Sequence, residues 1–259
     1  MAEQPYAIQM RGVTKTFGSV TANKDVDLNL RQGEILALLG ENGSGKTTLM
    51  NMLSGIYKPD RGDILVEGKP VSIDSPQDAK RLGIGMVHQH FKLVDVFSAA
   101  DNIWMGQEKT GLLLGRSRFS RVEEMAKRFG FDLDPRKKVA NMAVSEKQTL
   151  EIVKVLCYGA KVIILDEPTA VLTVQEIEKL FGVLRRMKEE GHSIIIITHK
   201  LNEVMEISDR VAVLRKGEYV GAVNTSETDE NQLTEMMVGK KISLNIERTE
   251  PKNPCDRLI

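Results

Sequence analysis

Residues Gly40–Thr47 read GENGSGKT, which matches the phosphate-loop pattern G-x-x-x-x-G-K-[ST]. The apolar stretch EILALL before it predicts a strand, and KTTLMNMLSG after it predicts a helix closed by Gly55. Gly43 and Gly45 let the backbone curl into an anion nest of inward N–H groups, to which the helix adds its positive N-terminal end. A glycine-rich turn that merely joins strand to helix is the alternative, and the lysine and threonine in register argue against it. The segment therefore predicts a strand–loop–helix unit that binds phosphates.

Each polar group of this loop has an expected part in nucleotide binding. Lys46 supplies a point charge to the β- and γ-phosphates, and the Thr47 hydroxyl is placed to ligate Mg²⁺. The residues expected to contact the nucleotide are Gly40, Glu41, Asn42, Gly43, Ser44, Gly45, Lys46, Thr47 and Thr48. The loop by itself leaves ATPases, GTPases and kinases open, so the function depends on the residues that accompany it.

A second motif lies at Lys161–Glu167, which reads KVIILDE and predicts a buried strand that ends in two carboxylates. Asp166, at the carboxyl end of the strand, is positioned to hold Mg²⁺ through its water shell. Glu167 suits a general base that orients and deprotonates an attacking water. A turn with two solvated acids is the alternative, and the phosphate loop earlier in the chain favours the catalytic interpretation.

Three further residues are candidates for the same site. The strand IIIIT ends at His199, where an imidazole could hydrogen-bond a γ-phosphate. Gln89 follows the strand IGMVH, and its amide could contact Mg²⁺ or the attacking water. Phe17, in KTFGSV ahead of the phosphate loop, could stack on adenine. The alternatives are a structural histidine, an ordinary polar loop residue and core packing, respectively.

Strand patterns alternate with helical patterns along most of the chain, which predicts an α/β fold with a mainly parallel sheet and an antiparallel β edge. Strand signals are absent between about residues 89 and 159, where helical stretches predict an all-helical insert. We expect an ATP-binding domain over 1–245, with a core of 1–88 and 160–245 and a helical subdomain of 89–159. Residues 246–259 are expected to be a tail or the start of a linker.

Composition excludes several classes of protein. The chain has 36 Lys and Arg and 36 Asp and Glu, and this balance argues against binding a polyanion through bulk electrostatics. Two cysteines cannot build a disulfide framework, which favours a reducing compartment. The longest apolar runs are far shorter than the ~20 residues that span a bilayer. We therefore expect a globular cytosolic protein.

The motifs described above occur in an order that resembles the ATP-binding subunit of an ABC transporter, over roughly residues 6–240. In chain order they are Phe17, GENGSGKT, Gln89, the helical insert, VIILDEPT and His199. Three stretches resemble the importer ATPases for simple sugars and nucleosides, namely GMVHQHFKLVDVF, LDEPTAVLT and LTEMMVG. Within the first of them, HQHF favours the nucleoside branch. The resemblance implies a P-loop NTPase fold with ATP and Mg²⁺ as cofactors. Because such proteins commonly carry two ATPase halves on one chain, it also implies an amino-terminal half followed by a linker.

The resemblance also implies partners. Two copies or halves close head to tail, with ATP between the phosphate loop of one and the signature segment of the other. Integral membrane permease subunits receive this motion, a solute-binding protein is an indirect partner, and no nucleic acid is involved. The protein would then be peripheral, on the cytoplasmic face of the cell membrane. The alternatives are an ABC-type ATPase outside transport and a nucleotide clamp with little turnover.

One segment departs from the family pattern. The family signature is close to LSGGQ, whereas Met142–Gln148 reads MAVSEKQ. Ala143 replaces the serine and removes a hydrogen-bond donor, and Val144 and Ser145 replace flexible glycines. Because a signature segment completes the opposite nucleotide pocket, we expect this chain's own phosphate loop and catalytic residues to be competent and the other composite site to hydrolyse slowly. Thr173, where many members have aspartate, is expected to be a feature of the branch.

Overall fold

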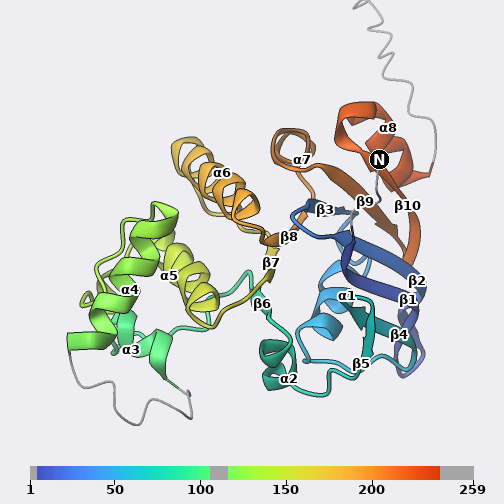
Figure 1. The fold of residues 1–259 in the computed structure, drawn as a ribbon. Helices are drawn as coiled ribbons and strands as arrows, with labels where there is room; N and C mark the ends of the chain where they lie inside the picture. Colours follow the sequence, from blue (N-terminus) through green and yellow to red (C-terminus); the bar gives the residue numbers. More distant parts are fainter. Residues whose placement is uncertain (1–4, 106–115, 240–259) are drawn as a thin grey trace, which may run out of the picture.

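The computed structural model describes residues 5–105 and 116–239, and its strands form two sheets (Figure 1). The larger sheet has six strands in the order β10-β9-β3-β8-β7-β6. Their bounds are Ile35–Leu39 (β3), Ile84–Val87 (β6), Val162–Asp166 (β7), Ser193–Thr198 (β8), Arg210–Arg215 (β9) and Glu218–Asn224 (β10). Neighbouring strands from β9 to β6 are parallel, and β10 pairs antiparallel with β9. The predicted mainly parallel sheet is confirmed.

The central strands of this sheet are buried along their whole length. Every residue of β3, β7 and β8 is buried, and the three strands carry the apolar runs ILALL, VIIL and IIII. A parallel sheet that is covered on both faces has continuous apolar strands rather than alternating ones. These runs therefore predict strands although they lack the two-residue period.

The second sheet is antiparallel throughout and has the order β2-β1-β4-β5. Its strands are Tyr6–Phe17 (β1), Val20–Arg31 (β2), Arg61–Val66 (β4) and Lys69–Val71 (β5). The expected antiparallel edge thus takes two forms, which are β10 on the main sheet and this separate sheet. Helix α1 (Lys46–Leu53) packs against both sheets, because its buried side chains Leu49, Met50 and Leu53 share one core with residues of β1, β2, β8 and β9.

The remaining helices are α2 (Pro76–Arg81), α3 (Ala99–Trp104), α4 (Arg116–Phe129), α5 (Val144–Cys157), α6 (Val174–Glu189), α7 (Leu201–Ile207) and α8 (Glu230–Val238). Two short 3₁₀ turns cover Val139–Asn141 and Thr225–Glu227. Among the described residues, no helix combines the length and the apolar character needed to cross a membrane.

Helices α3, α4 and α5 follow β6 and precede β7, and they form a group at one side of the molecule in Figure 1. They have a core of their own, in which Ile103, Val122 and Leu150 are fully buried. Within the described part of residues 89–159 there is no strand, in agreement with the expected helical insert. The domain ranges given above stay predictions, and the expected tail at 246–259 lies outside the described residues.

The topology brings four chain segments to one edge of the main sheet. Because β3, β6, β7 and β8 run parallel, the segments that follow them leave at the same edge. These segments carry the phosphate loop after β3, Gln89 after β6, Glu167 after β7 and His199 after β8. The fold therefore gathers the residues that the sequence analysis singled out.

Candidate functional site

The loop between β3 and α1 curls tightly and depends on glycine at two close approaches. A Cβ atom on Gly40 would lie 2.3 Å from the backbone oxygen of Leu214, and one on Gly45 would lie 2.4 Å from that of Ala22. Gly45 also has a φ of 94°, and Gly43 has a φ of 80° with no atom near the position of a Cβ. Gly43 is therefore required only for its backbone conformation, whereas Gly45 is required for its conformation and for space.

Two segments remote in sequence hold this loop in place. Asn23 on β2 is completely buried, and its Nδ2 atom donates a hydrogen bond of 3.2 Å to the carbonyl of Gly45. In the turn between β9 and β10, the backbone N–H of Gly217 donates to the carbonyl of Ser44 at 3.1 Å. Neither residue was predicted from the sequence, because no local pattern connects either of them with the phosphate loop.

Lys46 is buried inside the curl, with only 6% of its surface exposed. Its Nζ atom donates to the carbonyls of Gly40 at 2.7 Å and Glu41 at 2.9 Å. Burial lowers the pKa of Lys46, and the Glu167 and Asp166 carboxylates oppose this shift. The ammonium group therefore lies among backbone oxygens that a phosphate chain could replace. Four other loop residues expected to contact nucleotide are exposed or half-buried: Glu41, Asn42, Thr47 and Thr48.

The next group of polar atoms has the chemistry of a magnesium site. Thr47 Oγ1 donates to Asp166 Oδ1 at 3.4 Å. Burial raises the pKa of Asp166, while the hydrogen bond from Thr47 and the charge of Lys46 lower it. Hydroxyl and carboxylate oxygens are the ligands that Mg²⁺ prefers. Beside them, Ser44 Oγ is buried without a hydrogen-bond partner among the described residues, so the site also fits an added phosphate acceptor.

Glu167 brings the three predicted catalytic residues together. It has a φ of 48°, which is unusual for a residue with a side chain, and its N–H donates to Ile197 on the adjacent strand at 2.9 Å. One carboxylate oxygen accepts a hydrogen bond of 3.2 Å from Gln89 Nε2, and the other lies 3.1 Å from His199 Nδ1. Side chains from three different strand ends therefore meet at one carboxylate.

A second polar cluster, which we call the Thr169 network, lies next to this carboxylate and was not predicted. Thr169 Oγ1 donates to Glu203 Oε2 at 2.5 Å, and Lys200 Nζ lies 2.9 Å from Glu203 Oε1. Thr169 and Glu203 are almost fully buried. The sequence shows that Lys200 follows His199 directly, but it does not link Glu203, in the first turn of α7, with Thr169 on another loop.

Phe17 lies at the end of β1 with 43% of its surface exposed, which excludes the alternative that it packs in the core. Its ring contacts that of Tyr57 in a T-shaped arrangement with a centroid distance of 5.1 Å. Lys15 Nζ lies 5.5 Å from the ring centroid. An exposed ring supported from the side is compatible with stacking on a base, and the assignment to adenine stays a prediction.

The segment aligned with the family signature begins helix α5. Ala143 is the N-cap residue and offers no side-chain acceptor, but its N–H donates to Glu146 Oε2 at 2.8 Å. Glu146 is paired with Lys137 at 2.7 Å, and the hydrogen bond from Lys137 lowers the pKa of Glu146. Val144 is 46% exposed. The start of α5 is thus occupied by a carboxylate of its own chain.

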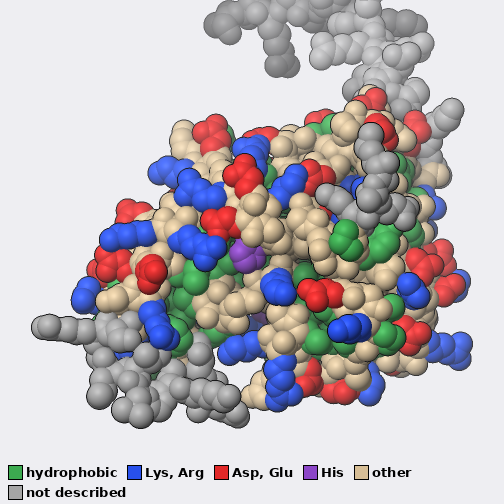
Figure 2. All heavy atoms as spheres, in the orientation of Figure 1, with side chains coloured by type: hydrophobic (Ala, Val, Ile, Leu, Met, Phe, Trp, Pro, Cys, Tyr) green, Lys and Arg blue, Asp and Glu red, His purple; other side chains and the backbone are tan. Residues whose placement is uncertain are grey.

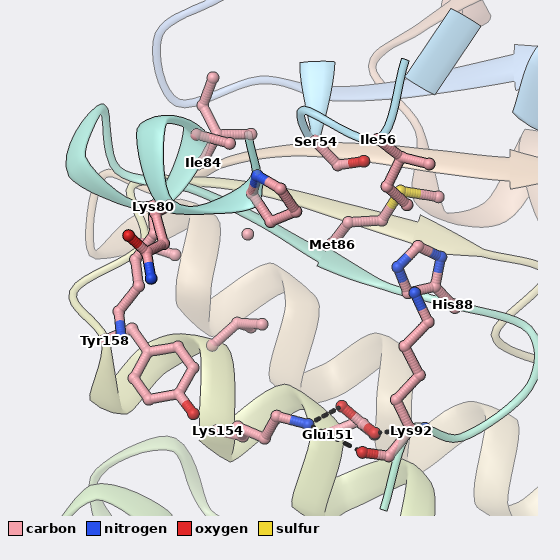
Figure 3. Close-up of a pocket in the computed structure, with 16 residues that line it drawn as sticks. Ser54, Ile56, Lys80, Ile84, Met86, His88, Lys92, Glu151, Lys154 and Tyr158 are labelled. Carbon is pink, nitrogen blue, oxygen red and sulfur yellow. Dashed lines mark hydrogen bonds and ion pairs between the residues drawn. The ribbon is translucent and has the colours of Figure 1, made fainter. Parts of the chain in front are cut away.

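A cavity of about 300 Å³ lies between α2, β6 and α5 and is shown in Figure 3. Its apolar lining includes Met86 and Val155, and Lys80 lies 3.7 Å above the ring of Tyr158. His88 lines this cavity one residue before Gln89. Burial lowers the pKa of His88. The cavity therefore lies directly beside the segment that carries Gln89.

Comparisons with known proteins agree with this geometry. Residues 23–170 match a family model described as "ABC transporter". The chain is 45% identical over 250 residues to the nucleoside import ATP-binding protein NupA of Lactococcus lactis subsp. cremoris, which covers 95% of this chain and 49% of the relative. It is 46% identical over 245 residues to the guanosine import ATP-binding protein NupO of Bacillus subtilis, with 94% and 48% covered. The chain spans about half the length of these relatives.

Solved structures show the same fold. A nucleotide-free ATP-binding cassette from an ABC transporter has a TM-score of 0.79 at 19% identity and covers 91% of this chain and 96% of that one. CbiO1 from Clostridium perfringens, part of the ABC transporter complex cbiONQ, has a TM-score of 0.76 at 30% identity, with 95% and 97% covered. The chain belongs to the ABC transporter family, as the motifs around the phosphate loop indicated.

Proposed function

We propose that the chain is the ATP-binding and ATP-hydrolysing half of an importer for nucleosides or simple sugars. The observation that carries this proposal is the Glu167 carboxylate, which contacts Gln89 and His199 at the edge of the sheet that also bears the phosphate loop. The names of the relatives, which are nucleoside, guanosine and ribose/galactose import ATP-binding proteins, support the class of solute.

The phosphate loop binds the triphosphate through its inward N–H groups and through Lys46, which exchanges the carbonyls of Gly40 and Glu41 for phosphate oxygens. Thr47 and Asp166 would hold Mg²⁺, which supplies neutralisation of charge on the phosphates. Phe17 carries the adenine. The burial of Lys46 strengthens its attraction for an anion, because few water molecules compete there.

Glu167 acts as the general base. Its carboxylate accepts a proton from the attacking water, and Gln89 and His199 fix the direction in which its oxygens point. His199, whose side chain is 48% exposed, also reaches toward the γ-phosphate. Gln89 lies where the chain passes from the main sheet to the helical insert, so its contact with Glu167 links the state of the nucleotide to the position of that insert.

A second ATPase domain completes the site. Val171 and Val174, which follow the catalytic strand, are 62% and 68% exposed and support an apolar contact with such a partner. The dimeric ATP-binding cassette MJ0796, bound to ADP and Pi, has a TM-score of 0.74 and 25% identity and covers 84% of this chain and 98% of that one. This likeness supports pairing of the same kind.

Permease subunits are the other proposed partner, and the cavity in Figure 3 is the proposed place of contact, because it lies beside Gln89 and between the core and the helical insert. The assembly then lies peripherally on the cytoplasmic face of the membrane, with a solute-binding protein as an indirect partner. Positive and negative side chains are interspersed over the face in Figure 2, which supports protein partners rather than nucleic acid.

The proposal is tested in the assembled transporter reconstituted in lipid vesicles. Replacing Glu167 with Gln should retain ATP binding and slow hydrolysis by at least about 100-fold, because the general base is lost. Glu178→Gln, an exposed change on α6, is the matched control and should leave hydrolysis unchanged. An equally active Glu167→Gln protein would refute the assignment of the base. ATP binding without turnover in the unmodified protein would instead support a nucleotide clamp.

The composite site completed by this chain's signature segment is proposed to be the slow one. Ala143 has no hydroxyl to donate to a phosphate, and its own N–H is already bonded to Glu146. Restoring the hydroxyl with Ala143→Ser adds a charge-assisted donor and should raise total turnover by up to about twofold, since a second site would join the first. An unchanged rate of ATP hydrolysis in the assembly would contradict this asymmetry.

A further inference from the structure

The Thr169 network joins two loops that each carry a catalytic side chain. Thr169 lies two residues after Glu167 on the loop that leaves β7. Lys200 directly follows His199 on the loop that leaves β8, and Glu203 is on α7, which continues that loop. Strands β7 and β8 are neighbours in the sheet (Figure 1), so the network forms a bridge across the gap between the two loops.

Thr169 and Glu203 are buried within this network, and Lys200 is half-buried. Both carboxylate oxygens of Glu203 are used, one by the Thr169 hydroxyl at 2.5 Å and the other by Lys200 Nζ at 2.9 Å. Lys200 Nζ also lies 3.2 Å from the carbonyl oxygen of Thr169. Glu203 is 5% exposed and Thr169 2% exposed. A buried carboxylate that loses one partner is costly, so the three groups hold one another at fixed separations.

The catalytic side chains need such a support. Glu167 adopts a left-handed backbone conformation, which persists only where the surrounding contacts determine it. Among the described residues, one hydrogen bond holds the His199 side chain, which is the 3.1 Å contact with Glu167, and the side chain is 48% exposed. Without a second connection between the two loops, small movements of either would change the direction of the base relative to the attacking water.

We propose that Glu203, through Thr169 and Lys200, is a positioning residue that sets His199 against Glu167 for hydrolysis. The inference rests on the proposed ATPase function. Glu203 is buried, and its hydrogen bonds within the described residues are to Thr169 and Lys200 and not to the phosphate loop, so it acts on the geometry of the base and leaves the nucleotide-binding groups unchanged.

The first test is kinetic and uses the assembled transporter. Glu203→Gln should lower kcat about tenfold and leave KM for ATP unchanged. Glu206→Gln, on the same helix but exposed and paired with Arg185, should change neither quantity. Thr169→Ser keeps the hydroxyl and should retain turnover, whereas Thr169→Val should reproduce the loss. In a His199→Ala background, Glu203→Gln should add less than about twofold. The full tenfold loss in that background would overturn the proposal.

A second readout does not depend on turnover. The ¹H–¹⁵N signals of the His199 ring, assigned by their loss in His199→Ala, report its contact with Glu167. They should shift in Glu203→Gln and remain in place in Glu206→Gln. Unchanged His199 signals in a folded Glu203→Gln protein would overturn the positioning role. Absence of ATP hydrolysis in the unmodified assembly would refute the proposed function instead, and the ring signals would still decide the role of Glu203.

Discussion

The starts of helices α1 and α5 differ in what they leave available to an anion. Helix α1 begins with Gly45 and Lys46 and has no acidic residue in its first turn. Helix α5 begins with Ala143, and Glu146 in its first turn accepts a hydrogen bond from the Ala143 N–H. Both helices have the same partial positive charge at this end. The difference predicts that an anion binds at the start of α1, where no carboxylate competes, and not at the start of α5, where Glu146 occupies an N–H group.

The largest expected effect is on ATP binding, and it is tested by replacing one lysine near the start of each helix. Lys46→Met removes the cation from the phosphate loop and should weaken ATP binding on the order of 100-fold, since charge-assisted contacts to two phosphates are lost. Lys147→Met is the matched change in the first turn of α5, where the lysine pairs with Asp95 at 3.3 Å. It should alter ATP binding by less than about threefold. Titration with a fluorescent ATP analogue measures both, and equal losses would contradict the proposed difference between the two helices.

Two glycines of the phosphate loop give a smaller contrast in stability. Gly43→Ala should lower the free energy of unfolding by about 1–2 kcal/mol, because only the backbone conformation opposes a side chain. Gly45→Ala should lower it by roughly a further 1–3 kcal/mol, because its Cβ would lie 2.4 Å from the carbonyl oxygen of Ala22. Urea unfolding of the two variants measures the difference. Similar losses would indicate that the loop can move away from β2.

The residues of the site that could be predicted from the sequence lie in contiguous motifs or directly after a strand. The phosphate loop is contiguous, so its glycines, lysine and threonine were recognisable from spacing alone. The meeting of Gln89, Glu167 and His199 followed from a second rule, since parallel strands end at one edge of a sheet. Both predictions rest on patterns within or directly after single strands.

The residues that were not predicted make their contacts with segments that are distant in the sequence. Asn23 and Gly217 support the phosphate loop from β2 and from the turn between β9 and β10. Their contacts depend on how the two sheets pack, and single polar residues on separate strands carry no periodic signal. Glu203 was missed for a related reason, because its partner Thr169 belongs to a different loop.

The smallest predicted effect concerns the carboxylate at the start of α5. Glu146→Gln removes the charge that pairs with Lys137 and should lower the free energy of unfolding near neutral pH by about 1 kcal/mol, the usual value of a cap with a partly exposed ion pair. The hydrogen bond from Lys137 lowers the pKa of Glu146 below the usual value of 4.5 for a glutamate. A lowered pKa means that this stabilisation is present above about pH 4.5 and is lost as the pH falls through the folded-state pKa. Urea unfolding at pH 7 and at pH 3 should therefore show a difference between the two proteins that shrinks in acid, and a difference independent of pH would show that the charge of Glu146 does not hold the start of α5.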